Sequence, residues 1–383
     1  MEYKKEVLIS LIFKPFDLII GLLLIRYLND ILTVSEVASY FLLISFSEIT
    51  RLVFIGQESQ IRNELNYNQY RIPIYITGIF WSLIFIILYF FELNIKNFDY
   101  NFLIITIPLV IAFQMVLESE FFIKTKSFLV GMLYSIQKAV LLILAITLSG
   151  SKIYDIYFLS LLVFILVTPF FINFKYLKLP KSEDYKIFLK KSSSFAILGV
   201  ATVVNNGIDV WLINSILESE DVFNYSISLR IIVIVLILNS LISTPVWNQM
   251  KKVGADKEKI FKVYNQLTPF ILFIGFLMVM FMESFADIIL NIDLEVPFYH
   301  KTVWMVYIII TNRMGWINQY FNSIGLAKFR SKIDLIYIIL NIPLSIFLIG
   351  LFGYIGAVIS TVVLMIIAYI IQVIYLKKIV TYV

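Results

Sequence analysis

The residues best suited to chemistry in this sequence are charged side chains inside long apolar segments. A charge in the hydrocarbon core of a membrane costs roughly 3 kcal/mol or more, so it normally faces a partner or a wet cavity. The basic residues in such segments are Lys14, Arg51, Lys138, Arg230 and Arg313, and the acidic residues well inside them are Asp17, Glu48 and Asp209. Three further acids lie nearer the segment ends, where they could reach the interface: Glu118, Glu120 and Glu283. Five bases against three acids predict a positive interior, which would attract an anionic substrate into a water-filled lumen.

Two of these charge pairs are close in the sequence. Lys14 and Asp17 are three positions apart, and so are Glu48 and Arg51. Residues at this spacing share one face of a helix, so both pairs could be structural ion pairs.

A third pair lies on either side of an acidic turn, residues 218–221. Asp209 precedes the turn and Arg230 follows it at a similar distance. Both would therefore sit about 12 Å below the same membrane surface, where they could meet.

Lys138 and Arg313 have no such neighbour, and each lies near the middle of its apolar segment. Three amides in the same segment as Arg313 lie at helical spacing: Asn312, Gln319 and Asn322. A polar face of that length predicts that the segment lines a lumen. We therefore predict substrate-binding cations, pairing or coupling acids and polar lumen residues. The cations are Lys14, Lys138, Arg230 and Arg313; the acids are Asp17, Glu48 and Asp209; the amides are Asn312, Gln319 and Asn322.

The elements that must position these residues are runs of about twenty apolar residues, each long enough to cross a bilayer. Hydrophobic residues make up 60% of the 383 residues, and the mean hydropathy is +0.91. This composition predicts an all-α polytopic membrane protein. The twelve predicted spans are roughly 6–25, 36–56, 72–91, 101–121, 128–149, 153–174, 193–216, 222–247, 265–286, 302–324, 333–350 and 354–376.

Charge and repetition predict the topology. Most Lys and Arg residues fall in the short segments on the side of the N-terminus, so both termini are predicted to be cytoplasmic. The motif Glu36-Val37-x-x-Tyr40 returns as Asp221-Val222-x-x-Tyr225, which suggests two parallel halves. The predicted organisation is a first six-helix half, a basic cytoplasmic linker and a second six-helix half: residues 1–174, 175–192 and 193–383.

Composition also excludes several kinds of site. There is no cysteine and only one histidine, His300, so thiolate and His-cluster metal sites are excluded. A metal site made of carboxylates alone stays open, but we expect no metal and no cofactor. No catalytic residues are expected either, because no nucleophile–base arrangement stands out. The net charge of +5 resides in membrane-flanking loops, so no nucleic-acid partner is expected.

Several motifs, in order along the chain, resemble those of polysaccharide flippases of the Wzx type. They are Leu24-Ile25-Arg26-Tyr27-Leu28 with Glu36-Val37-x-x-Tyr40, the segment 57–65, Gly207-Ile208-Asp209 with Tyr225 and Arg230, Gly325-Leu326-Ala327-Lys328, and Gly353-Tyr354-Ile355-Gly356-Ala357. The sequence departs from the family pattern where a glycine is usual, at Asn29, Ser39 and Asn224.

The resemblance implies the multidrug/oligosaccharidyl-lipid/polysaccharide exporter superfamily, with twelve helices in two pseudo-symmetric, MATE-like six-helix bundles. Its implied activity is moving an undecaprenyl-diphosphate-linked oligosaccharide, an O-antigen or capsule repeat unit, from the inner to the outer leaflet of the bacterial inner membrane by alternating access. The implied partners are membrane lipid, the lipid-linked glycan, H⁺ or Na⁺ as coupling ion, and other polysaccharide-assembly proteins.

Two other functions stay open. An ion-coupled multidrug exporter of the same fold would be expected to have a more acidic lumen, because typical drug substrates are cationic. A membrane polysaccharide polymerase usually carries a large outer loop, whereas the predicted outer loops here are short.

Overall fold

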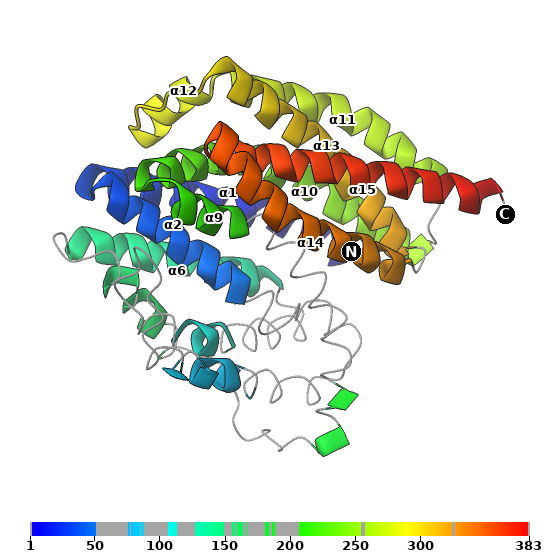
Figure 1. The fold of residues 1–383 in the computed structure, drawn as a ribbon. Helices are drawn as coiled ribbons and strands as arrows, with labels where there is room; N and C mark the ends of the chain where they lie inside the picture. Colours follow the sequence, from blue (N-terminus) through cyan, green and yellow to red (C-terminus); the bar gives the residue numbers. More distant parts are fainter. Residues whose placement is uncertain are drawn as a thin grey trace. The chain divides into compact units, whose positions relative to one another are not determined.

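The computed structural model describes residues 2–50, 76, 78–84, 86–87, 106–112, 127–148, 155–157, 159–163, 166, 181–183, 186–187, 207–253, 257–323 and 326–381. Every regular element in these ranges is a helix (Figure 1), which confirms the all-α prediction for this part of the chain. The chain divides into two compact units, Met1–Trp211 and Leu212–Val383. Most of the predicted linker, 175–192, lies outside the described ranges, so the predicted boundary between halves stays a prediction.

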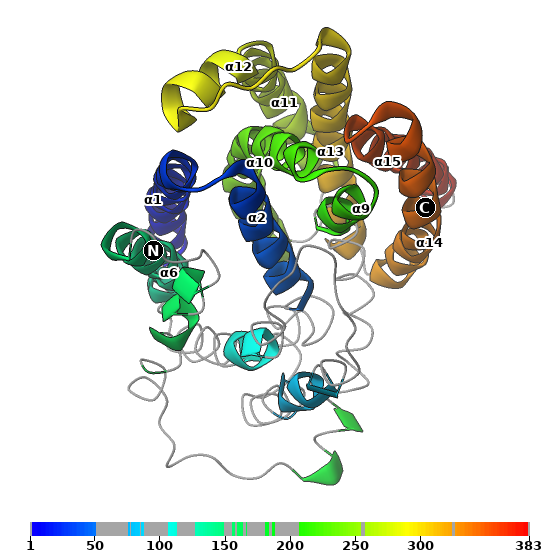
Figure 2. The same cartoon turned by 60° about the vertical axis from the view of Figure 1, so that its left-hand side comes forward.

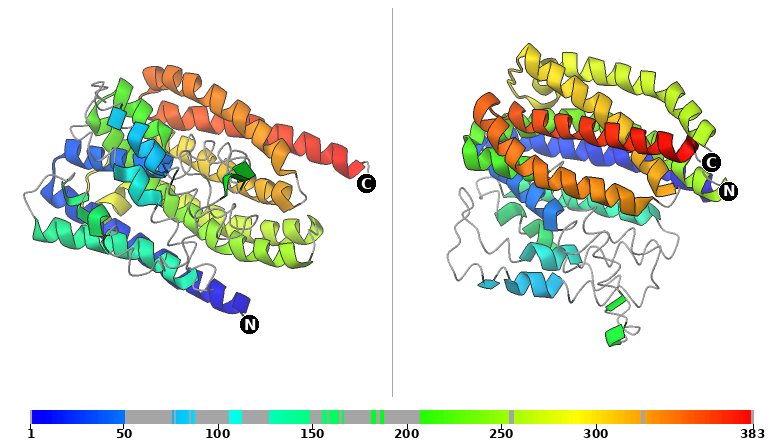
Figure 3. Two further views of the ribbon diagram at one scale, coloured as in Figure 1. Left: turned by 90° about the horizontal axis from the view of Figure 1, so that it is seen from below. Right: turned by 45° about the vertical axis from the view of Figure 1, so that its right-hand side comes forward.

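The first unit contains α1 (Glu2–Ile31), α2 (Val34–Ile49) and α6 (Ser127–Thr147). Helices α1 and α6 pack side by side (Figure 3, left). A capping box begins α2: Thr33 Oγ1 accepts the N–H of Glu36, and the Glu36 carboxylate accepts the N–H of Thr33 at 3.0 Å. These bonds satisfy two backbone donors that the first turn leaves free.

Helix α9 (Ile208–Ile216) contains the boundary between the units, and seven helical segments follow it. They are α10 (Ser219–Val253), α11 (Lys257–Met280), α12 (Met282–Phe285), the π-helix η3 (Ala286–Leu290), α13 (Phe298–Ser323), α14 (Ala327–Phe352) and α15 (Ile355–Thr381). Helix α13 packs against α10, α11 and α15 (Figure 2).

A tight turn joins α14 and α15 into a hairpin (Figure 1). Gly353 has a φ of +67°, a conformation that side chains with a Cβ rarely adopt. A Cβ on Gly356 would clash with the backbone carbonyl of Leu348. The Gly353-x-x-Gly356 spacing thus permits the close return of the chain.

Two helical segments of the described residues are long and apolar enough to cross a membrane, Phe329–Phe352 and Ile355–Lys377. They coincide with the last two predicted spans, and they support a membrane-embedded protein. The described parts of α1, α2, α6 and α9–α13 also lie where spans are predicted. The count of twelve spans in two bundles stays a prediction.

The predicted ninth span, 265–286, is wrong as a continuous helix. Its chain bends by 77° between Tyr264–Met280 and Met282–Leu290. The break is at Phe281, whose φ of −102° and ψ of 23° leave the helical range. Apolar periodicity could not predict this break, because the contacts that hold it come from residues 296 and 301, described below.

Candidate functional site

The best-defined charged contact in the first unit joins Asp17 of α1 to Lys138 of α6. Asp17 Oδ2 and Lys138 Nζ are 2.6 Å apart. Their side chains are 30% and 36% exposed, so the pair is reachable from its surroundings. A Cβ added at Gly21 would lie 3.7 Å from Lys138 Nζ, which is an ordinary van der Waals contact, so Lys138 packs directly against α1 at this glycine.

This contact differs from the pairing that local spacing suggested. Sequence spacing offered Lys14 as a partner for Asp17 and left Lys138 without one, but the structure pairs Asp17 with Lys138. The Lys14 side chain and Arg51 lie outside the described residues. The second carboxylate oxygen, Asp17 Oδ1, is buried without a hydrogen-bond partner in the described part of the chain. The carboxylate thus retains an unused acceptor.

The other predicted acids lie on α2 and at the start of α9. Glu48 is exposed on α2. Asp209 is 1% exposed, and it follows Gly207, whose carbonyl accepts a 2.6 Å hydrogen bond from Ser45 Oγ. Arg230, the predicted partner of Asp209, is half-buried on α10 in the other unit. A contact between Asp209 and Arg230 therefore stays a prediction.

In the second unit, Arg313 packs against an aromatic pair from α11 and α13. Its guanidinium carbon lies 5.2 Å from the centre of the Tyr264 ring. Tyr264 in turn meets Trp316 edge-to-face, with ring centres 5.1 Å apart. Arg313 itself is exposed, whereas both rings are buried. A cation–π contact fixes the guanidinium without neutralising its charge.

The polar residues of α13 serve partly as contacts between helices. Asn312 is 1% exposed, and its Oδ1 accepts a long, 3.5 Å hydrogen bond from Thr268 Oγ1 of α11. Asn318 Oδ1 accepts a 3.0 Å bond from Gln372 Nε2 of α15. Such amide bonds hold membrane helices together. Lumen lining by Asn312 stays a prediction, and the side chains of Gln319 and Asn322 lie outside the described residues.

Sequence reasoning missed Thr268 and Gln372 as partners of the α13 amides. The available signal was weak: Thr268 stands just before the apolar run of α11, and Gln372 is a polar residue within the apolar run of α15. Because their partners are 44 and 54 positions away, the pairing itself could not be read from spacing.

A second feature missed in the sequence is a polar and aromatic cluster at the start of α13. His300 Nδ1 and Tyr354 Oη are 3.0 Å apart, and their rings meet edge-to-face. Burial lowers the pKa of His300. The imidazole shares its hydrogen bond with the tyrosine hydroxyl.

Among the described residues, the His, Asp and Glu side chains do not gather in groups of three or more. Each unit thus holds one of the predicted cations next to a different kind of neighbour. Lys138 is held by a carboxylate and Arg313 by an aromatic ring.

No protein-family profile and no curated protein matches the sequence. Solved structures do match the fold. The lipid II flippase MurJ in its inward closed conformation aligns with a TM-score of 0.69 and 15% identity over 97% of this chain and 87% of that chain. An inward-facing multidrug resistance MATE transporter of the MOP superfamily aligns with a TM-score of 0.62 and 13% identity over 97% and 98% of the two chains.

A third match is a mutant of the Vibrio cholerae MATE transporter VcmN, with a TM-score of 0.57 and 12% identity over 100% of this chain and 98% of that chain. Identities of 12–15% show a shared fold and do not carry over a substrate. The chain therefore shares its fold with this flippase and these transporters.

Proposed function

We propose that this protein is a flippase for an anionic, lipid-linked oligosaccharide, with undecaprenyl-diphosphate-linked O-antigen or capsule repeat units as the substrate class. The observation that carries the proposal is the exposed guanidinium of Arg313, held on Tyr264 at 5.2 Å within a helix of a MOP-type fold. A guanidinium can bind phosphate oxygens through two parallel hydrogen bonds, which suits a diphosphate.

Aromatic neighbours hold the guanidinium in place. Tyr264 and Trp316 form an edge-to-face pair next to it, and both rings are buried. The rings therefore support Arg313 from below, and the guanidinium is the part of this cluster that a substrate could contact.

Lys138 supplies a second cation in the proposal, and the carboxylate of Asp17 compensates its charge. When Asp17 is ionised, the ammonium group of Lys138 is neutralised by the 2.6 Å ion pair. Binding of H⁺ or Na⁺ by Asp17 would release Lys138 for an anionic headgroup and so couple transport to an ion gradient. Lys14 and Arg230 complete the proposed set of cations, Glu48 and Asp209 remain proposed pairing acids, and Gln319 and Asn322 are proposed polar lumen residues.

The proposed setting is the bacterial inner membrane, with both termini in the cytoplasm and alternating access as the transport cycle. The positive-inside distribution of Lys and Arg supports this orientation. Lipid is the immediate partner, and other polysaccharide-assembly proteins would supply and consume the glycan. No enzymatic step is proposed, because MurJ and the MATE proteins that share the fold are a flippase and transporters.

The test is complementation of a strain that lacks its own polysaccharide flippase. The parent protein should restore full-length surface polysaccharide, Arg313→Lys should restore part of it, and Arg313→Ala should restore little. Lys262→Ala is the matched control, because Lys262 is an exposed cation at the start of α11. Full restoration by Arg313→Ala, at normal expression, would refute the assignment of this site.

An ion-coupled drug exporter is the second candidate, favoured by the MATE transporters that share the fold. Its substrates would be organic cations, for which Arg313 and Lys138 are unfavourable neighbours. Resistance to cationic drugs in cells that express the protein, together with failure of the complementation, would select this function.

A further inference from the structure

The far end of α11, opposite its lysine-rich start, carries an apolar surface that the proposed function does not use. Helix α11 exposes Phe270, Phe273 and Leu277 at helical spacing, so one stripe of this helix faces outwards. The stripe continues through Phe281, which is 61% exposed at the bend, to Ile288, which is 69% exposed beyond it. Because the exposed apolar residues continue on both sides of the 77° bend, we expect both segments to face the same apolar surroundings.

The bend decides what the second segment can do in a membrane. Met282–Leu290 leaves the axis of Tyr264–Met280 at 77° (Figure 1). If α11 crosses the bilayer, the second segment lies almost parallel to the membrane plane. A helical segment of this size is about 13 Å long, well short of the roughly 30 Å hydrocarbon core. It therefore cannot be a span of its own.

The remaining faces of this segment are divided between protein and water. Met282, Ala286 and Leu290 are buried against the protein. Asp287 and Asp293 are exposed at the end of the segment and in the loop after it. The segment thus offers a buried face, an exposed apolar face and exposed carboxylates, which is the pattern of an element at a membrane–water boundary.

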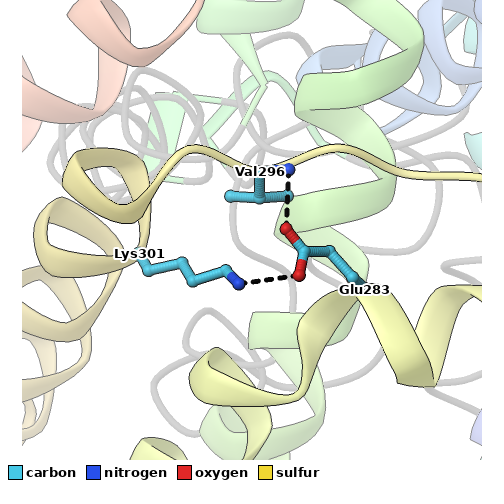
Figure 4. A network of polar contacts seen from close by, with 3 residues as sticks. All are labelled: Glu283, Val296 and Lys301. Carbon is cyan, nitrogen blue, oxygen red and sulfur yellow. Dashed lines mark hydrogen bonds and ion pairs between the residues drawn. The ribbon is translucent and has the colours of Figure 1, made fainter.

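A polar clamp holds the segment in this orientation (Figure 4). Glu283 Oε1 accepts the backbone N–H of Val296 at 3.0 Å, and Glu283 Oε2 accepts a hydrogen bond from Lys301 Nζ at 2.8 Å. The bonds tie α12 to the following loop and to the start of α13. The bend is therefore fixed by specific hydrogen bonds and is not a frayed helix end.

We propose that Met282–Leu290 is an interfacial helix that lies on the membrane surface opposite the lysine-rich start of α11. Its partner is the lipid at the boundary between headgroups and acyl chains, with Phe281 and Ile288 inserted and Asp287 and Asp293 in water. Continuity with the α11 stripe favours lipid as the occupant. The carboxylates would repel anionic headgroups, so the association is apolar.

The absence of cysteine from the sequence allows a direct test with the full chain in phosphatidylcholine nanodiscs. Spin labels are attached to Ile288→Cys, Asp293→Cys and Ile339→Cys, and their collision with oxygen and with a water-soluble nickel chelate is compared. Ile339 is the deep control, because it is 61% exposed near the middle of the Phe329–Phe352 span. Ile289→Cys repeats the measurement if Ile288→Cys fails to fold, as judged by gel filtration.

The expected depth of the Ile288 label is about 5–10 Å below the lipid phosphates. The Asp293 label should be in water, and the Ile339 label should be near the bilayer midplane, about 20 Å below the phosphates. Three results would overturn the proposal: a chelate accessibility at Ile288 equal to that at Asp293, a depth equal to that of Ile339, or protection from both collision partners, which would indicate a protein contact. None of them would alter the outcome of the complementation test.

Discussion

Asp17 Oδ2 and Lys138 Nζ lie 2.6 Å apart and join α1 to α6 across 121 positions of the chain. Each side chain carries a charge that would be costly alone in an apolar segment, and each removes part of that cost for the other. The pair is therefore both a structural contact and the most direct candidate for coupling substrate binding to an ion.

Replacing one member of this ion pair should destabilise the protein more than replacing both. Asp17→Asn or Lys138→Met leaves one charge without its partner, whereas the double variant leaves neither. Because both side chains are about one-third exposed, we expect a coupling energy of only about 1–2 kcal/mol. Thermal unfolding of the four proteins in detergent measures it, with Lys262→Met as a control for loss of one exposed charge. Purely additive effects would show that the ion pair contributes no stability.

The Glu283 clamp should protect a single backbone amide from hydrogen exchange. Glu283→Ala removes the acceptor of the Val296 N–H, and a hydrogen bond to a charged group contributes about 1.5–3 kcal/mol. Exchange at Val296 should therefore be about tenfold faster or more in this variant, as measured by hydrogen–deuterium exchange with mass spectrometry.

Lys301→Met is the matched variant for this measurement. It removes the 2.8 Å bond to Glu283 Oε2 and leaves the acceptor of the Val296 N–H in place. Its effect on exchange at Val296 should be clearly smaller than that of Glu283→Ala. Equal protection of Val296 in the parent protein and in Glu283→Ala would contradict the clamp.

His300 should make the folded state less stable in mild acid. Burial lowers its pKa in the folded protein, while the unfolded chain keeps the ordinary value of about 6.5. Protonation thus favours unfolding: the stability is complete above about pH 6.5 and falls as the pH drops through that value towards the lower folded pKa. The groups that face the imidazole are the rings of Tyr299 and Tyr354.

The measurement is the melting temperature between about pH 8 and pH 5 in detergent. His300→Gln should flatten the part of the decline that lies below about pH 6.5, because glutamine does not titrate. Tyr354→Phe removes the hydroxyl next to His300 Nδ1 and keeps the titrating group, so it should lower the stability and preserve the decline. An unchanged pH profile in His300→Gln would place the sensitivity elsewhere.

Alanine should be tolerated at Gly350, within α14, and should destabilise the protein at Gly356, at the turn into α15. A Cβ on Gly356 would clash with the Leu348 carbonyl, so Gly356→Ala should cost about 1–3 kcal/mol through backbone displacement. Gly350 has open space around its Cβ position within α14, and Gly350→Ala should be neutral or stabilising by up to about 1 kcal/mol. Comparison of the two melting temperatures checks this, and equal values would contradict the tight turn.

Part of the fold follows from the sequence alone. The apolar runs predicted helices at α13, α14 and α15. The capping box that begins α2 was not predicted, although Thr33 and Glu36 are only three positions apart. These features depend on residues within a few positions of each other. Composition and periodicity were therefore sufficient for the helical class and for the unusual charge of Arg313 in an apolar segment.

Tertiary structure alone decided which distant residues meet. The partner of Asp17 is Lys138 on another helix, the ring beneath Arg313 comes from Tyr264, and the break at Phe281 is held by a residue that follows a loop. The spacing of apolar residues along the sequence predicts which face of a helix is buried, but it does not predict which distant segment packs against that face. The pairing of charges is set by the three-dimensional packing of the helices, because each burial cost is offset by whichever group the fold brings within reach.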